Sequence, residues 1–162
     1  MRRLALLAAV ASVLLAGCGF QLRGSASYAF STIHVGAPPA LPFTQELKRA
    51  LADAGPARVL DSPQGADVVL DIVSVGDDKS VLSLSPGGRA REFQLAKRVQ
   101  FSLRAPTGAV WLPQDTIEIR RSYLYDDTER LAREIQEQRL LKEMQTDAIA
   151  QIVRRLQAAR RP

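Results

Sequence analysis

The 162-residue sequence contains one cysteine, one histidine and one tryptophan. A single cysteine cannot form a disulfide within the chain, and so few cysteine and histidine side chains leave few metal ligands or nucleophile–base pairs. HExxH, CxxC, Gly-x-Ser-x-Gly and glycine-rich phosphate-loop motifs are also absent from the sequence. The composition therefore indicates neither an enzyme nor a protein with a metal or another cofactor, and we interpret His34 as structural or solvated.

The sequence also lacks an apolar run of membrane-spanning length. The run from Leu4 to Leu15 follows the basic Met1-Arg2-Arg3 and is shorter than the roughly 20 residues of a spanning helix. A basic start, a short apolar middle and small residues at a cleavage point predict an export signal over residues 1–17. Leu15-Ala16-Gly17-Cys18 resembles the bacterial lipobox, which implies that Cys18 is lipidated and becomes the new N-terminus; an incidental thiol is the alternative.

The lipobox resemblance implies three acyl chains on Cys18, and one acyl chain alone holds a protein at a membrane only marginally. Gly19 in place of an aspartate implies sorting to the outer membrane, and residues 18–31 are expected to form a tether. The formal charge of +5 falls by two when Arg2 and Arg3 leave with the signal. Because an exported lipoprotein does not routinely meet nucleic acid, we expect anionic lipids, phosphorylated glycolipids or acidic proteins as partners of this basic chain.

Residues 32–158 show the periodicity of one α+β domain. Apolar residues at helical spacing predict a helix of about 12 residues that ends at Gly55-Pro56, and a second helix from Asp126 to about Ala158. Short apolar or alternating segments predict strands. We therefore expect a two-layer sandwich in which two helices cover one face of a mixed four-stranded sheet. The predicted strands are residues 32–35, 68–72 with a continuation to 84, 92–104 and 110–125.

Charged residues interrupt this pattern at several positions. Lys97 and Arg121 fall on the otherwise apolar faces of their strands, where an unpaired charge is costly. They either reach water at the sheet margin or at a bulge, or converge to receive an anion; the sequence allows both. Asp77 and Asp78 are adjacent and are expected at a turn or bulge rather than as a catalytic pair.

The last helix is longer than the predicted sheet. Asp126 and Glu129 suit a helix start, and about 30 residues at 1.5 Å per residue give roughly 45 Å. We therefore expect the first turns of this helix to extend past the sheet.

Four short motifs stand out along the chain. They are Cys18-Gly19-Phe20-Gln21-Leu22-Arg23-Gly24, Glu92-Phe93-Gln94-Leu95, Arg121-Ser122-Tyr123 and Lys142-Glu143-Met144. Their order and spacing, from the lipobox to about residue 157, resemble the LptE family of lipopolysaccharide-assembly lipoproteins.

The resemblance implies an outer-membrane lipoprotein that plugs the large β-barrel LptD, assists its folding and binds lipopolysaccharide. The family's basic contacts lie in the turn after the second strand and near the start of the last helix. Arg133 matches the second position, whereas Pro86 occupies the first, with Arg89 and Arg91 just beyond it. We expect lipopolysaccharide contacts from Arg89, Arg91, Lys97 and Arg133, and a barrel interface at Arg121 and Tyr123.

Two other functions remain open at this point. The chain could be a generic envelope lipoprotein that scaffolds another complex, such as the barrel-assembly machinery. It could also be a periplasmic carrier or enzyme for a small ligand, which would require a closed pocket.

Overall fold

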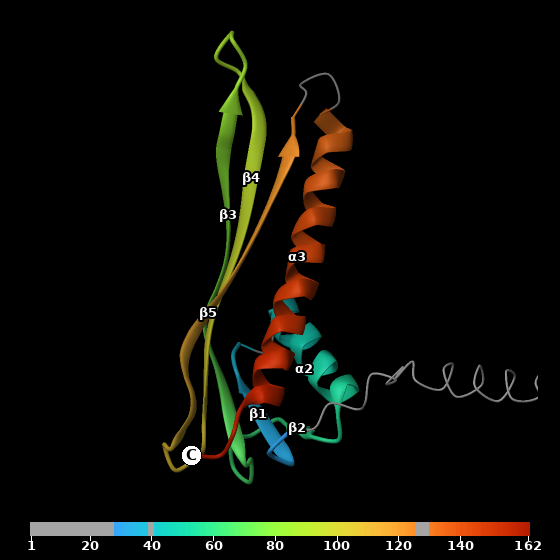
Figure 1. Cartoon of the computed structure of the whole chain (residues 1–162). Helices are drawn as coiled ribbons and strands as arrows, with labels where there is room; N and C mark the ends of the chain where they lie inside the picture. Colours follow the sequence, from blue (N-terminus) through green and yellow to red (C-terminus); the bar gives the residue numbers. More distant parts are fainter. Residues whose placement is uncertain (1–27, 39–40, 126–129) are drawn as a thin grey trace, which may run out of the picture.

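The computed structural model describes residues 28–38, 41–125 and 130–162 as an elongated, two-layer α+β domain (Figure 1). The predicted signal, the tether up to residue 27 with Cys18, and the helix start at Asp126 and Glu129 lie outside the described residues. In chain order the elements are β1 (Thr32–Gly36), α2 (Pro42–Ala54), β2 (Arg58–Leu60), β3 (Val68–Leu84), β4 (Ala90–Arg104), β5 (Val110–Leu124) and α3 (Arg130–Ala158).

The sheet has five strands in the order β2-β1-β3-β4-β5, so the prediction of four strands was wrong. The additional strand is β2, whose three residues are too few for an alternating pattern to be recognised. The predicted mixed sheet and the two helices are confirmed. β1 runs parallel to β2 and β3, whereas β3, β4 and β5 pair antiparallel through tight turns.

Strands β3 and β4 form a long hairpin that reaches beyond the start of α3 (Figure 1). The predicted continuation of β3 to Leu84 is confirmed. Asp77 and Asp78 lie within the strand and pair with Lys97 and Ala96, so their expected position at a turn or bulge was wrong. The register of β3 against β4 instead shifts between Ile72 and Ser74, which is three residues before Asp77.

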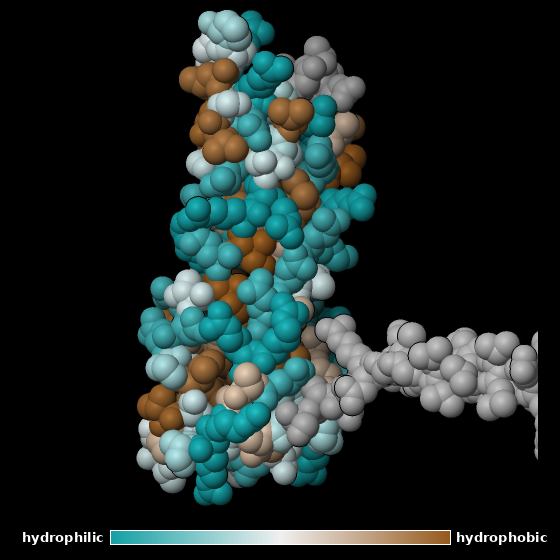
Figure 2. Space-filling model, in the orientation of Figure 1, coloured by the Kyte–Doolittle hydropathy of each residue, from teal (hydrophilic) through white to brown (hydrophobic). Residues whose placement is uncertain are grey.

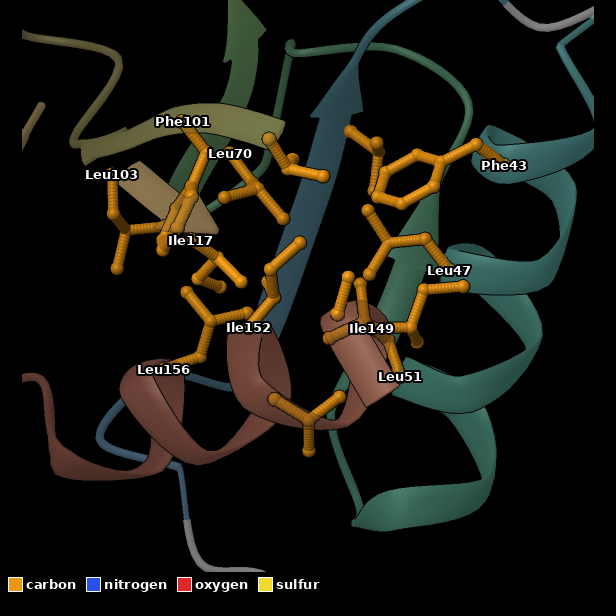
Figure 3. Close-up of a cluster of buried hydrophobic side chains, with 14 of the residues drawn as sticks. Phe43, Leu47, Leu51, Leu70, Phe101, Leu103, Ile117, Ile149, Ile152 and Leu156 are labelled. Atoms are coloured by element: carbon orange, nitrogen blue, oxygen red, sulfur yellow. The ribbon is translucent and has the colours of Figure 1, made fainter. Parts of the chain in front are cut away.

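The apolar core lies between the sheet and the two helices at the end of the molecule that contains β1 and β2 (Figure 3). α2 contributes Phe43, Leu47 and Leu51, and the predicted stripe of α3 packs beside them. The residues that fill this core from the sheet and α3 include Ile33, Leu70, Phe101, Leu103, Ile117, Met144, Ile149, Ile152 and Leu156.

Helix α3 is anchored unevenly along its length. Met144, Ile152 and Leu156 are fully buried, whereas Leu131 and Ile135 are 72% and 64% exposed. The first turns of α3 nevertheless run beside β5 and the hairpin, because strands of 15 to 17 residues at about 3.3 Å per residue are as long as the helix (Figure 1). The expectation that these turns extend past the sheet was therefore wrong.

Candidate functional site

The candidate site is the end of the molecule at which the β3–β4 turn, the end of β5 and the start of α3 come together; we call it the tip (Figure 1). The turn is closed by two backbone hydrogen bonds, from Ser85 N–H to the Arg89 carbonyl and from Gly88 N–H to the Ser85 carbonyl. Gly88 has φ +78°, a conformation that glycine adopts without a steric cost. This turn exposes Arg89 at the end of the hairpin.

Arg91 connects the hairpin to the end of β5. Its carbonyl accepts a 2.8 Å hydrogen bond from the N–H of Tyr125, one residue beyond β5. The register of β3 and β4 shifts on either side of Ser83, and Arg91 is the extra residue of β4 at the second shift. Because a bulge changes the direction of a strand locally, the exposed side chain of Arg91 lies at a break in the regular sheet.

Arg133 lies at the end of the first turn of α3, and its Nη1 donates a 2.9 Å hydrogen bond to Oε1 of Gln136. Glu137, one turn further along, contacts both β3 and β5. The β3–β4 turn, the start of β4 and the start of α3 lie at the same end of the molecule (Figure 1). These segments carry Arg89, Arg91 and Arg133, the three arginines that were predicted to bind lipopolysaccharide.

A charged and aromatic cluster fixes α3 to the strands just below the tip. Oε2 of Glu137 accepts 2.5 Å hydrogen bonds from Nζ of Lys79 in β3 and from the hydroxyl of Tyr123 in β5. The ring of Phe93 stacks on Tyr123 with 5.9 Å between centroids and meets Tyr125 edge-on. Nζ of Lys79 lies 4.5 Å from the Phe93 centroid, within the range of a cation–π contact.

This environment shifts three pKa values. Burial acts to raise the pKa of Glu137, but the hydrogen bonds from Lys79 and Tyr123 outweigh it and lower that pKa. Burial acts to lower the pKa of Lys79, and its bonds to Glu137 and Tyr123 reverse the direction and raise it. Burial and the Glu137 carboxylate raise the pKa of Tyr123. The lysine and the glutamate are therefore held in their charged forms, and the tyrosine in its neutral form.

Several large apolar side chains of the tip are exposed to solvent. Figure 2 shows hydrophobic groups on the surface at both ends of the molecule, with a mainly hydrophilic stretch between them. Arginines beside apolar side chains can contact both halves of an amphiphile, since guanidinium groups pair with phosphates and apolar side chains pack against hydrocarbon. The exposed apolar residues at the tip are Val81, Leu82, Leu84, Leu124, Leu131 and Ile135.

Lys97 lies on the helix-covered face of β4, as predicted, but it does not extend to the margin of the sheet. Its side chain is 3% exposed, and its Nζ lies 2.6 Å from Oδ1 of Asp77 on the neighbouring strand. The two residues are direct cross-strand partners. Asp77 already compensates the buried charge of Lys97. Because the ammonium group is also enclosed by the protein, Lys97 is left out of the candidate lipopolysaccharide site.

Arg121 and Tyr123, the two residues predicted at a barrel interface, belong to β5, and the side chains of both contact α3. Arg121 donates to Oδ2 of Asp147 on α3 at 2.9 Å and to the carbonyl of Arg120 at 3.2 Å, and half of its side chain is exposed. Tyr123 is 5% exposed beneath α3. The exposed part of Arg121 is accessible to a partner protein, whereas the ring of Tyr123 packs against Phe93 of the same chain.

Sequence reasoning did not identify Lys79 and Glu137 as site residues. Alternation along β3 from Val75 could have placed Asp77 and Lys79 on the face that α3 covers. The partner of Lys79 could not have been identified in this way, because Glu137 lies 58 residues away in the chain.

Within the described ranges, no group of three or more potential ligands could hold a metal ion. Over the same residues, no helix combines the length and hydropathy needed to span a membrane.

Comparisons with known proteins agree with this architecture. A solved structure of lipoprotein B from Nitrosomonas europaea is 33% identical, with a TM-score of 0.76, and the match covers 86% of this chain and 91% of that one. For the rare lipoprotein B from Shewanella oneidensis the identity is 25%, the TM-score is 0.68, and the coverage is 78% and 94%.

Curated relatives point to the same group. The LPS-assembly lipoprotein LptE of Photorhabdus laumondii is 26% identical over 96% of this chain and 85% of its own length. The protein of the same name from Yersinia enterocolitica is 27% identical over 96% of this chain and 75% of its own. The family model described as LptE, lipopolysaccharide-assembly, matches residues 30–156. The chain therefore belongs to the LptE family.

Proposed function

We propose that the protein is an outer-membrane lipoprotein that binds lipopolysaccharide at its tip and that plugs, and helps to assemble, an LptD-type β-barrel. The observation that carries this proposal is that the β3–β4 turn with Arg89, the start of β4 with Arg91 and the start of α3 with Arg133 lie at one end of the fold, together with exposed apolar side chains. Lipopolysaccharide presents phosphates and acyl chains together. Guanidinium groups form paired hydrogen bonds with phosphate oxygens, so the tip has groups for both parts.

The uncovered face of the sheet supports the plugging role. It carries ion pairs that remain in contact with water, among them Arg98 and Arg120 with Glu118 and, further along, Arg104 with Asp71. The lumen of a large outer-membrane barrel is polar. A domain with a hydrated, charged face can therefore occupy such a lumen without burying unpaired charge.

Anchoring through Cys18 would hold the domain at the membrane. Each buried methylene of an acyl chain contributes about 0.8 kcal/mol, so several chains on one residue hold the protein stably where one chain would hold it only marginally. This part of the proposal rests on the lipobox sequence.

The proposal is tested by charge reversal at the tip. The variant Arg89→Glu/Arg91→Glu/Arg133→Glu should stay folded, because these side chains lie outside the core, and should lose most of its binding to immobilised lipopolysaccharide. The matched control is Arg49→Glu/Lys142→Glu/Arg154→Glu, which changes the charge equally at exposed positions away from the tip. Circular dichroism establishes that both variants are folded.

Equal binding by the tip variant and the wild-type protein would remove the tip from the proposal. Equal loss in both variants would show that lipopolysaccharide binds through overall charge and not at a defined site. If the protein co-purifies with the β-barrel of another complex, the alternative function is favoured, that of a generic envelope lipoprotein that scaffolds that complex.

A further inference from the structure

The end of the molecule opposite the tip, which we call the base, consists of residues 28–31, the β4–β5 turn and the residues after α3. A cleft of about 490 Å³ lies there, lined by Phe30, Trp111 and Arg161 among other residues. Tyr28 stacks on Phe30 with 5.0 Å between ring centroids, and Trp111 meets Phe30 edge-on at 6.2 Å. The base therefore carries three aromatic rings in contact, two of which have a polar atom.

Basic and apolar groups surround these rings. Val110 is 56% exposed, and Figure 2 shows hydrophobic groups at this end of the surface. Arg58, Arg160 and Arg161 are exposed, and Arg160 directs Nη1 to the carbonyls of Gln157 and Ala159.

One acid at the base is Asp67, whose carboxylate already accepts hydrogen bonds from the backbone N–H groups of Ser31 and Thr32 at 2.8 and 2.9 Å. These two bonds, opposed by slight burial, lower the pKa of Asp67, and the nearby Arg161 lowers it further. A second acid, Asp71, is paired with Arg104 at 2.6 Å. Both carboxylates are therefore engaged within the fold, whereas Arg58 and Arg160 are exposed.

The base is also where the chain enters the fold. Cys18 and Tyr28 are ten residues apart in the sequence, and a fully extended chain covers at most about 3.6 Å per residue, or roughly 36 Å. An acyl group on Cys18 therefore keeps residue 28 within roughly 36 Å of the membrane. Tyrosine and tryptophan are enriched at membrane–water interfaces, and arginines are attracted to anionic headgroups.

We infer that the base docks on the anionic phospholipid headgroups of the leaflet in which Cys18 is anchored. Arg58, Arg160 and Arg161 contact the phosphates, and Val110 and Trp111 lie at the level of the headgroups. This inference goes beyond lipopolysaccharide binding, although it rests on the anchoring part of the proposed function. Docking by the base, before the domain enters a barrel, directs the long axis of the domain away from the leaflet and holds the tip at the far end.

Trp111 tests the inference directly, because it is the only tryptophan in the chain. The protein is purified from membranes and reconstituted, without any barrel, into phosphatidylethanolamine–phosphatidylglycerol vesicles that contain brominated lipid. Bromine close to the headgroups should quench Trp111 emission. In the matched variant Trp111→Phe/Tyr125→Trp, the tryptophan lies at the tip and its emission should remain unquenched.

Charge reversal separates docking from anchoring. Each arginine lost next to an anionic leaflet should lower the ratio of docked to undocked domain about fivefold. Arg160→Glu/Arg161→Glu should therefore abolish most of the quenching while flotation with the vesicles is unchanged. The matched control, Arg49→Glu/Lys142→Glu, should be quenched like the wild-type protein.

Unquenched Trp111 in the floated wild-type protein overturns the inference, as does equal quenching at tip and base. If the protein does not float, the anchoring proposal fails separately. Quenching is then measured after simple mixing with the same vesicles, and its dependence on Arg160 and Arg161 still decides whether the base binds headgroups.

Discussion

Nζ of Lys97 lies 2.6 Å from a carboxylate oxygen of Asp77, in a direct cross-strand pair on the face of the sheet that α3 covers. The lysine is almost completely buried, whereas Asp77 is 45% exposed. A buried charge that loses its partner is costly, but a buried ion pair that is replaced by apolar groups often costs little. The two residues should therefore respond very differently to substitution.

Asp77→Asn should lower the free energy of unfolding by about 2–4 kcal/mol, because it leaves the ammonium of Lys97 buried without a compensating charge. Lys97→Met removes the buried charge itself and should change stability by less than about 1.5 kcal/mol. Urea denaturation compares both variants. If Lys97→Met is the more destabilising of the two, the burial of an ion pair is not what sets the stability at this position.

Lys97→Met should also bind lipopolysaccharide as the wild-type protein does. The ammonium of Lys97 is enclosed and paired in the fold, so a ligand at the surface would not meet it. A large loss of binding in a folded Lys97→Met protein would restore Lys97 to the ligand site.

Glu137→Gln should destabilise the domain by about 1–2 kcal/mol at neutral pH, since it weakens the hydrogen bond from Tyr123 and removes the ion pair with Lys79. The pKa of Glu137 is lowered in the folded state, so its contribution is present above its ordinary pKa of 4.5 and is lost as the pH falls through the folded value. The variant should therefore lose less stability on acidification than the wild-type protein does.

Thermal unfolding measured from pH 7 down to pH 3 checks this dependence. The control is Glu134→Gln, which lies one turn earlier on an exposed position of α3 and should behave as the wild-type protein. Identical acid profiles for Glu137→Gln and the wild-type protein would contradict the cluster's role.

The two halves of α3 should differ in stability. Leu156→Ala, in the core, should cost about 2–5 kcal/mol, whereas Leu131→Ala, on an exposed position, should change stability by no more than about 0.5 kcal/mol. Hydrogen exchange should be faster in residues 131–141 than in residues 144–158, since local opening is easier where few apolar groups are buried. Uniform protection along α3 would contradict this difference.

Cys18→Ala should leave the domain folded and release it from the membrane, because the core formed by the described residues does not include Cys18, which would carry the acyl chains. Fractionation after expression measures the release, and circular dichroism of the soluble fraction confirms folding. A Cys18→Ala protein that stays firmly in the membrane fraction without a partner would contradict lipid anchoring.

The general architecture was predictable because its signals are local. α2 follows from apolar residues at helical spacing before Gly55-Pro56, and β4 follows from the alternation between Phe93 and Leu103. β2 was missed because its three residues are too few to show the alternation of apolar and polar side chains that identifies a strand.

The site was only partly predictable, because its contacts join distant parts of the chain. The alternation of side chains along β4 predicted that Lys97 lies on the face covered by the helices. The compensation of its charge by Asp77 could not be predicted, because it depends on the register of β3 against β4. The Glu137 cluster likewise depends on how α3 lies over the sheet. Family resemblance indicated Arg89, Arg91 and Arg133, and the fold places them at one end.

The central claim is that this LptE-family chain works at the outer membrane together with a large β-barrel and lipopolysaccharide. Affinity purification of the tagged protein from outer membranes, followed by identification of whatever is retained, tests it most directly. We expect one large barrel protein of the LptD type together with lipopolysaccharide, and less lipopolysaccharide with the Arg89→Glu/Arg91→Glu/Arg133→Glu variant. Recovery of the chain alone, or with the barrel of a different assembly complex and no lipopolysaccharide, would contradict the claim.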